Sequence, residues 1–352
     1  MTNQPDHDNS PLLLGIKLGT ARTAVVSSRG YRQLTPSVVG YPRDIIAIRL
    51  LGKTQVFGDQ ALAHKSALVL YHPLRDGLAA DSGKSNYNAG SELLQQIISE
   101  ARQGESGDIS AVIAVPARTS PAARQTLQQM AAQFCRNALI LPEPYLVAYH
   151  LNRLANCLLV DIGAGGVTVC AIKGSAPLPQ DQAVLPRGGD YLDQQLQALV
   201  NQHHQGLHIS LTQARQIKEQ YGYVGAAPEQ VQLTLRAKGK PGLYDLTDEL
   251  GAVCGSIVPE VVEQLASLLP SFDPEDQETA LQHIYLTGGG SRIRRLAGMI
   301  AEGMHEYGPV RVSCVDEPEY GGAEGALQLA AELPPADWQE FGLANRLPEA
   351  GS

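Results

Sequence analysis

Two short turns rich in small residues are the part of this sequence best suited to chemistry. Residues 19–23 read GTART, and residues 163–166 read GAGG. Small side chains let backbone amides approach phosphate oxygens closely, and successive amides form a nest that binds anions. Either turn taken alone is better explained as the glycine turn of an ordinary β-hairpin. Two matched copies in one chain instead favour a pair of phosphate-binding loops.

Two carboxylates stand next to expected strand ends. Asp161 immediately precedes the second turn, where a carboxylate is placed to hold Mg²⁺ through water, or alternatively to cap the turn. Glu143 lies in Leu-Pro-Glu-Pro, and the flanking prolines fix the direction in which it projects. It could orient a water for attack on a γ-phosphate. The alternative is a glutamate at a helix N-terminus, stabilised by the helix dipole.

Three further groups are weaker candidates. The glycines of residues 288–290 follow an expected strand and could lie flat against a base or ribose, or simply form a tight strand-to-helix turn. Lys218 and Glu219 fall inside an expected helix and are typical of a solvated helical face. The histidines near residues 203–208 have no cysteine or acidic cluster to complete a ligand set, so no histidine metal site is expected.

An internal repeat indicates which elements position these residues. Residues 12–30 and 157–174 each read as an apolar strand, a glycine-containing turn and a second strand. Aligning Gly19 with Gly163 places Ile16 on Val160. Repeats of this kind predict two related α/β domains facing each other across a cleft.

The remaining chain alternates expected strands and helices, which predicts a mixed, largely parallel sheet in each lobe. Ser120-Pro121 supplies an N-cap and a first-turn proline for a helix that should run to about residue 135. The other expected strands are 110–115, 138–141, two within 229–247, and 283–287. The other expected helices are 143–151, 189–205, 210–221, 250–270 and 292–305, with a short helix and a frayed end beyond residue 332.

Composition excludes several classes of protein. The chain has 352 residues and a formal net charge of -9, whereas nucleic-acid binding requires a basic face. Its five cysteines form no CxxC pair, which favours buried thiols in a reducing compartment. Residues 1–11 are polar and unlike a signal peptide, and the longest apolar runs are strand-sized. A cytoplasmic protein without a membrane span is therefore expected.

The ordered motifs resemble the actin superfamily over nearly the whole chain. Residues 12–23 and 160–170 are similar to its two phosphate loops, and 138–149 to the connecting segment that carries the catalytic acid. Residues 284–293 match the adenosine motif, and 321–326 resemble the second connecting segment. The stretch 217–219 is similar to the actin segment that touches the ribose and base, which gives Lys218 and Glu219 an expected role.

The length and motif style are similar to bacterial actins of the MreB type. The segments that resemble the magnetosome branch of these actins are PSVVGYP (36–42), AVIAVPAR (111–118), VDIGAG (160–165), RAKGKP (236–241), GGGSRIR (288–294) and AELPP (331–335). The resemblance implies the actin-like ATPase fold, with duplicated ribonuclease H-like lobes around a nucleotide cleft. Lobe I is expected at 12–153 plus about 325–345, lobe II at 154–324, and flexible tails at 1–11 and 346–352.

The resemblance also implies a function. ATP and Mg²⁺ are the expected cofactors, Glu143 and Asp161 the catalytic residues, and Asp161 the metal ligand. The expected partners are further copies of the chain in a cytoplasmic filament that positions magnetosomes, another actin homologue and adaptor proteins. The residues implied to contact the nucleotide are Lys17, Gly19, Thr20, Ala21, Gly163, Ala164, Gly165, Gly189, Lys218, Glu219, Gly288, Gly289, Gly290 and Arg292.

The sequence departs from the family pattern at both phosphate loops. Lys17 stands where the family has an aspartate, and Gly166-Val167 replaces hydroxyl donors. Lys17 could contact phosphate and partly substitute for Mg²⁺, could repel the metal, or could turn away and leave Asp161 to hold it alone. One hypothesis is therefore a slow ATPase coupled to filament turnover. Another is a hydrolysis-deficient subunit that assembles with an active actin. A small-molecule kinase lacks a candidate base beside an acceptor pocket.

Overall fold

The computed structural model describes residues 10–75, 83–334 and 336–338. The chain divides into two compact units, one comprising residues 1–146 and 322–352 and the other 147–321, and each is described by itself. The expected flexible tails, 1–11 and 346–352, lie outside the described residues except for positions 10 and 11. The end of the expected returning segment, 339–345, also lies outside them. The lobe boundaries expected near residues 153 and 325 stay a prediction.

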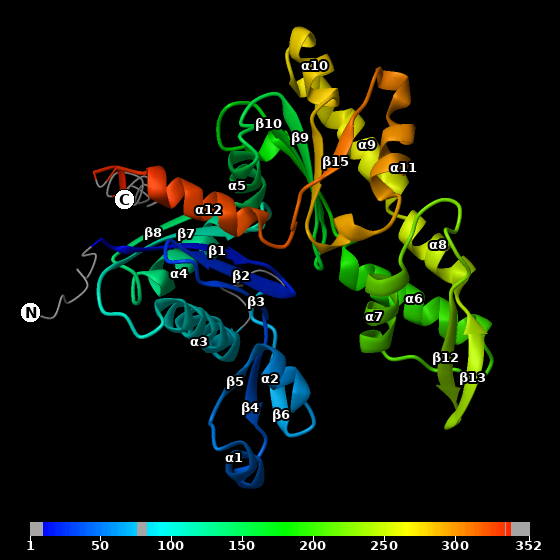
Figure 1. The fold of residues 1–352 in the computed structure, drawn as a ribbon, viewed down its shortest axis with the longest axis horizontal. Helices are drawn as coiled ribbons and strands as arrows, with labels where there is room; N and C mark the ends of the chain where they lie inside the picture. The colour runs from blue at the N-terminus through cyan, green and yellow to red at the C-terminus, as the bar shows by residue number, and fades with distance from the viewer. Residues whose placement is uncertain (1–9, 76–82, 335, 339–352) are drawn as a thin grey trace, which may run out of the picture. The chain divides into compact units, whose positions relative to one another are not determined.

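Unit 1 is built on a five-stranded mixed sheet with the strand order β3-β2-β1-β7-β8 (Figure 1). The central strand β1 pairs antiparallel with β2 and parallel with β7. The expectation of a largely parallel sheet is therefore correct on the β7 side of β1 and wrong on the β2 side. The reason is that β1, β2 and β3 are joined by tight turns, which return the chain antiparallel. The strands are β1 (Leu12–Leu18), β2 (Arg22–Ser27), β3 (Arg32–Pro36), β7 (Ile109–Val115) and β8 (Asn137–Pro142).

Helices cover both faces of this sheet. Side chains of α3 (Gly83–Arg102) and α4 (Pro121–Ala131) form one buried cluster with it. Leu146 of α5 (Glu143–His150) and side chains of α12 (Gly321–Glu332) form another. A Cβ on Gly15 would lie 2.1 Å from the Ala323 carbonyl oxygen, so α12 can approach β1 closely only because residue 15 is glycine. Burial of both faces explains why β7 is buried along its whole length and is apolar at every position except Ser110.

A second, smaller sheet in unit 1 has the order β5-β4-β6 and packs on its own small core of Val38, Val56, Ala61 and Leu68. It comprises β4 (Val39–Pro42), β5 (Val56–Phe57) and β6 (Leu68–Tyr71), with α1 (Ile45–Leu51) and α2 (Gly58–Ala63). No element was expected between residues 31 and 109. The strands here are short, which gives a weak period-2 pattern.

The main sheet of unit 2 repeats that of unit 1, with the order β11-β10-β9-β14-β15. Its strands are β9 (Cys157–Ile162), β10 (Val167–Ile172), β11 (Gln182–Leu185), β14 (Ile284–Thr287) and β15 (Val312–Cys314). The register confirms the internal repeat. Ile16 lies opposite Val25 in the first hairpin, and Val160 lies opposite Val169 in the second.

The other elements of unit 2 are helices and one hairpin. The α-helices are α6 (Gly189–His203), α7 (Leu211–Tyr221), α8 (Thr247–Gly255), α9 (Val258–Leu268), α10 (Pro274–Leu281) and α11 (Leu296–Gly303). The hairpin is β12 (Gln232–Ala237) with β13 (Lys240–Asp245), and the 3₁₀ turns are Pro179–Asp181, Leu269–Ser271, Gly289–Arg292 and His305–Tyr307.

Three expected helices have wrong bounds. The single helix expected over 250–270 is two helices, because Pro259 in the first turn of α9 has no N–H to continue the ladder from α8. The helix expected from 292 begins at Leu296, since Arg295 adopts a φ of 67°. The helix expected to reach about residue 135 ends at Ala131, after which the backbone turns toward β8.

One stretch of the described chain, Thr247–Ser271, is long and apolar enough to cross a membrane by length and composition alone. In the structure this stretch contains α8 and α9, and their side chains, such as Leu250 and Leu265, are buried in the core of unit 2. Of the most apolar 18-residue window of this stretch, 39% is buried within the structure.

Candidate functional site

The first small-residue turn joins β1 to β2 in unit 1 and is held by a short hydrogen-bonded chain. Ser37 Oγ donates to the Gly19 carbonyl oxygen at 2.8 Å and lies 2.9 Å from Thr23 Oγ1. A Cβ on Gly19 would lie 2.5 Å from the Arg22 carbonyl oxygen. The turn is thus fixed in shape, and its residues Gly19, Thr20 and Ala21 remain half-buried and accessible.

Lys17 and Glu143 meet at one edge of the unit 1 sheet. Lys17 pairs with Ala114 of β7, and Ala114 pairs in turn with Leu141 of β8, so the carboxyl ends of β1 and β8 lie at the same edge. The Lys17 Nζ atom lies 2.6 Å from Glu143 Oε1, with the two side chains only 10% and 3% exposed. Lys17 therefore points toward the expected catalytic carboxylate, and the three roles suggested for it toward phosphate and Mg²⁺ stay predictions.

This buried ion pair constrains the chemistry of Glu143. Breaking a buried pair by removing one partner typically costs about 3–5 kcal/mol, because the other charge is left uncompensated. A carboxylate oxygen engaged by an ammonium is also less available to accept a proton from water. The start of α12 closes in on the same side chain, since a Cβ on Gly322 would lie 3.1 Å from Glu143 Cγ.

In unit 2, Asp161 lies between two glycine turns. It is buried at the end of β9, opposite Thr168 of β10 and Thr287 of β14. Gly288 has a φ of 76°, and a Cβ there would lie 2.4 Å from Asp161 Oδ1. A carboxylate in this position suits Mg²⁺, which is usually bound by one or two carboxylates together with substrate phosphates.

No cluster of three or more histidine, cysteine or acidic side chains that could hold a metal is found among the described residues. His203 Nδ1 and His204 Nε2 instead lie 3.0 Å and 3.3 Å from the same oxygen, Oε1 of the buried Glu249. These contacts join the end of α6 to α8. Within the described chain, Mg²⁺ would rely on Asp161 and the phosphates of a bound nucleotide.

The second small-residue turn is bonded to the start of α6. The Gly163 N–H donates to the Gly166 carbonyl oxygen at 3.0 Å, which closes the turn. The N–H groups of Gly189 and Asp190 donate to the carbonyl oxygens of Gly163 and Ala164 at 2.9 Å and 2.8 Å. The N–H of Gly189 is therefore used to support the turn. Gly165 remains half-buried in the same loop.

Lys218 is buried, so the interpretation of this residue as part of a solvated helical face is wrong. Its Nζ lies 2.6 Å from Asp193 Oδ1 and donates to the Gly189 carbonyl oxygen at 2.7 Å. Arg215 Nε bonds Asp193 Oδ2 at 2.9 Å. Burial alone would lower the pKa of Arg215, but the neighbouring carboxylates outweigh it and raise the pKa. Glu219, by contrast, is exposed.

The third glycine turn lies against the end of β9. A Cβ on Gly290 would lie 2.2 Å from Ile162 Cγ2, whereas a Cβ on Gly289 would meet no atom within 4 Å. Arg292 leaves this turn and forms a bidentate pair with Glu319, at 2.7 Å for both bonds, which raises the pKa of Arg292. Sequence reasoning missed Asp193 and Glu319, since nothing in their local sequence marks them.

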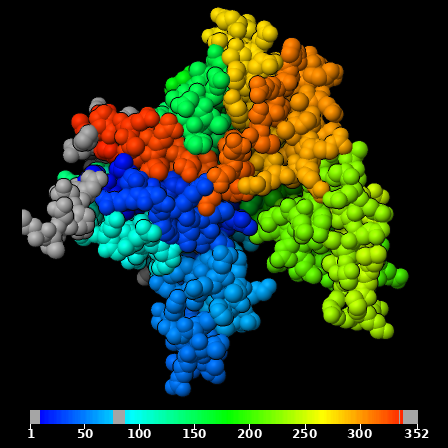
Figure 2. Space-filling view, viewed as in Figure 1, coloured from blue at the N-terminus to red at the C-terminus, as the bar shows by residue number. Residues whose placement is uncertain are grey.

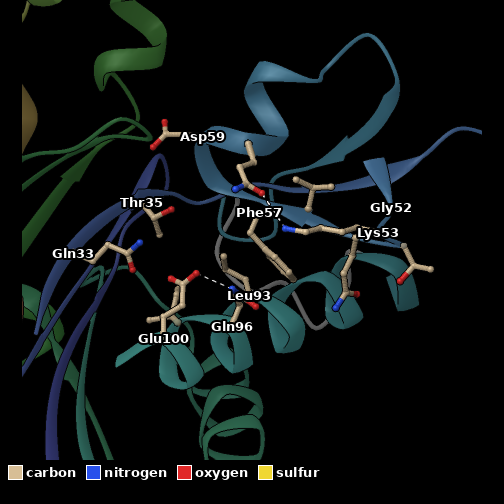
Figure 3. A pocket seen from close by; sticks show the side chains of 14 residues that line it. Gln33, Thr35, Gly52, Lys53, Phe57, Asp59, Leu93, Gln96 and Glu100 are labelled. Atoms are coloured by element: carbon tan, nitrogen blue, oxygen red, sulfur yellow. Dashed lines mark hydrogen bonds between the residues drawn. The ribbon is translucent and has the colours of Figure 1, made fainter. Parts of the chain in front are cut away.

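A cavity of about 600 Å³ in unit 1 is lined by none of the expected site residues (Figure 3). Lys53 bonds Gln60 on one side of it, and Gln96 bonds Glu100 on the other. The cavity lies against the small sheet and α3 and takes no part in the candidate site.

Comparison with known proteins gives consistent results. A family model described as "MreB/Mbl protein" matches residues 12–335. The actin-like protein MamK of Paramagnetospirillum magneticum is 42% identical over 94% of this chain and 95% of the relative. A MamK-like protein of the same organism is 32% identical over 95% of this chain and 99% of the relative.

Two solved structures are also similar. A MamK double helical filament has a TM-score of 0.89 at 42% identity, covering 92% of this chain and 100% of that one. A non-polymerising MamK mutant bound to AMPPNP has a TM-score of 0.76 at 41% identity, covering 92% and 100%.

Proposed function

Because this chain belongs to the MreB/Mbl family and has the actin-like fold, we propose that it binds ATP and assembles with further copies of itself into a cytoskeletal filament. The observation that carries the proposal is the pair of matched hairpins, each ending in a small-residue turn beside a buried charged side chain, Lys17 in unit 1 and Asp161 in unit 2. The AMPPNP bound to a similar protein supports the choice of nucleotide.

The residues of each unit have distinct proposed tasks. In unit 1, the turn of Gly19, Thr20 and Ala21 offers backbone amides to phosphate oxygens, with the Lys17 ammonium nearby. In unit 2, the turn at 163–165 does the same, and the turn at 288–290 lies against the nucleoside. Asp161 would hold Mg²⁺, which supplies positive charge to the phosphates.

For hydrolysis, Glu143 is the residue proposed to orient the attacking water. It is rigidly placed, because α5 begins at Glu143 directly after β8, and α12 packs against its side chain. Its pairing with Lys17 favours slow hydrolysis. The same observation supports the second candidate function, a nucleotide-binding subunit that hydrolyses poorly and assembles with an active actin homologue.

The filament is the proposed working form. The similar proteins include a MamK double helical filament, and by analogy this chain would form a cytoplasmic filament that positions magnetosomes through adaptor proteins. Removal of the γ-phosphate would then control filament turnover.

Phosphate release and sedimentation of the purified protein test this proposal. Wild type should pellet with ATP and release phosphate, and Glu143→Gln should still pellet while releasing phosphate at least about 100-fold more slowly. Glu105→Gln, on the exposed partner of Arg29, is the matched control and should behave as wild type. Absence of ATP-dependent pelleting in wild type would exclude the filament, and unchanged turnover in Glu143→Gln would exclude its role.

A further inference from the structure

The Lys17 side chain runs beside the first phosphate turn as well as toward Glu143. Its register neighbours on β2 and β7 are Ala24 and Ala114, whose small side chains leave room for the lysine stem. A Cβ on Gly19 would lie 3.8 Å from Lys17 Cε. One buried ammonium therefore stands next to both the proposed water-orienting carboxylate and the turn proposed to bind phosphate.

The sign of the charge at residue 17 determines whether a phosphate at the first turn is attracted or repelled. An aspartate at the end of β1 would repel phosphate unless a cation stood between them, whereas an ammonium attracts it directly. The difference is two charge units, and the interaction between charges about 4 Å apart is stronger in a partly buried site than in bulk water. The ammonium also has three N–H donors, so it can serve Glu143 and a phosphate oxygen together.

We propose that Lys17 is the built-in cation of the first phosphate turn, so that the protein binds nucleotide without needing a divalent cation. This inference rests on the proposed nucleotide binding and concerns how the charge of the phosphates is balanced. Glu143 and the phosphates share the ammonium, and bound nucleotide loosens its hold on Glu143. Mg²⁺ can still bind at Asp161, but its binding then adds little to the affinity for nucleotide.

Calorimetric titration of the full chain with AMPPNP tests this, because the analogue separates affinity from turnover. Wild type should bind with affinities that agree within about threefold in EDTA and in excess MgCl₂. Lys17→Asp should bind at least about tenfold more weakly in EDTA than in MgCl₂, since it regains the need for a cation. Lys53→Asp makes the same charge change on an exposed lysine of unit 1 and should match wild type.

Two further variants keep the test decisive if Lys17→Asp fails to fold. Lys17→Met keeps the aliphatic stem, and its affinity in EDTA should fall at least about tenfold. Glu143→Gln removes the competing carboxylate, and its affinity in EDTA should rise. Wild-type binding that is lost in EDTA and restored by MgCl₂ would overturn the inference while leaving the proposed function intact. Failure to bind in either buffer would overturn both.

Discussion

The Lys218 ammonium lies 2.6 Å from Asp193 Oδ1 and 2.7 Å from the Gly189 carbonyl oxygen. Through this contact α7 is tied to the first turn of α6. The Gly189 N–H in turn donates to the carbonyl oxygen of Gly163. The buried ion pair between Lys218 of α7 and Asp193 of α6 thus helps to hold the turn at residues 163–166 in place.

Replacing Lys218 by methionine should therefore destabilise unit 2. The variant keeps the aliphatic stem and leaves Asp193 paired with Arg215, whose Nε lies 2.9 Å from Asp193 Oδ2. The expected loss is about 3 kcal/mol in the free energy of unfolding, at the lower end for a broken buried pair because Arg215 still compensates one oxygen. Urea denaturation measures it. The exposed Lys240→Met is the control, and an equal effect in the two variants would show that the pair contributes nothing.

Neighbouring glycines in the third turn should respond very differently to alanine. Gly288 has a φ of 76° and no room for a Cβ beside Asp161, whereas Gly289 meets open space. Gly288→Ala should lower the unfolding free energy by about 1–3 kcal/mol through backbone strain, and Gly289→Ala should change it by less than about 0.5 kcal/mol. Thermal or urea unfolding of the two variants side by side measures the difference. Equal stabilities would contradict the close approach to Asp161.

The fold was largely predictable because its signals are local. Each hairpin is a continuous segment with a turn between two apolar strands, so the repeat is visible in the sequence, and the register of Ile16 with Val25 and Val160 with Val169 bears it out. The strands between residues 31 and 109 were not predictable, because they are only 2 to 5 residues long. Helix α3 lies in the same segment and is 20 residues long, so its length does not explain why it was missed.

The partners of the buried charges were not predictable for a different reason. Lys17 and Glu143 are far apart in the sequence and meet only because β1 and β8 end at the same edge of one sheet. Lys218 lies in a helix with polar neighbours, and the local pattern does not reveal that α6 covers it. Which charges are paired depends on tertiary packing, so the roles of these residues stay a prediction.

Helix α1 has several exposed apolar side chains, and we expect it to contribute to filament assembly. Asp44 caps the helix, and Ile45, Ile46 and Leu50 are exposed. The helix itself lies at one end of the small sheet (Figures 1 and 2). Exposed apolar side chains grouped on one element favour a protein contact. Ile46, 74% exposed, can be changed to aspartate without burying the charge, so Ile46→Asp should fold normally but sediment poorly with ATP.

The matched control is Leu243→Asp, since Leu243 is 66% exposed on the β13 strand of unit 2. Normal sedimentation of Leu243→Asp with loss in Ile46→Asp would assign the contact to α1. Circular dichroism and the urea midpoint should be unchanged in both variants. Normal sedimentation of Ile46→Asp would show that assembly does not use this helix.

The buried thiols should make the protein less stable in alkaline solution. Burial raises the pKa of Cys254 from 9.0 to about 11, and it raises the pKa values of Cys135 and Cys157 to about 12. The folded state therefore keeps these protons at a pH where the unfolded chain has lost them. The stabilisation is complete below about pH 9 and is lost as the pH rises toward 11, by about 1.4 kcal/mol per pH unit for each thiol.

Cys254→Ala isolates one thiol, and the quantity to compare is the slope of the unfolding free energy with pH, since the cavity left by alanine lowers stability at every pH. Urea denaturation at about pH 8 and about pH 10.5 should show a smaller alkaline loss in Cys254→Ala than in wild type, by roughly 1–2 kcal/mol. Ionisable groups that do not interact with Cys254 are common to both proteins, so their contribution to the difference cancels. If the unfolding free energy falls equally in wild type and in Cys254→Ala, then Cys254 ionises as readily in the folded protein as in the unfolded chain.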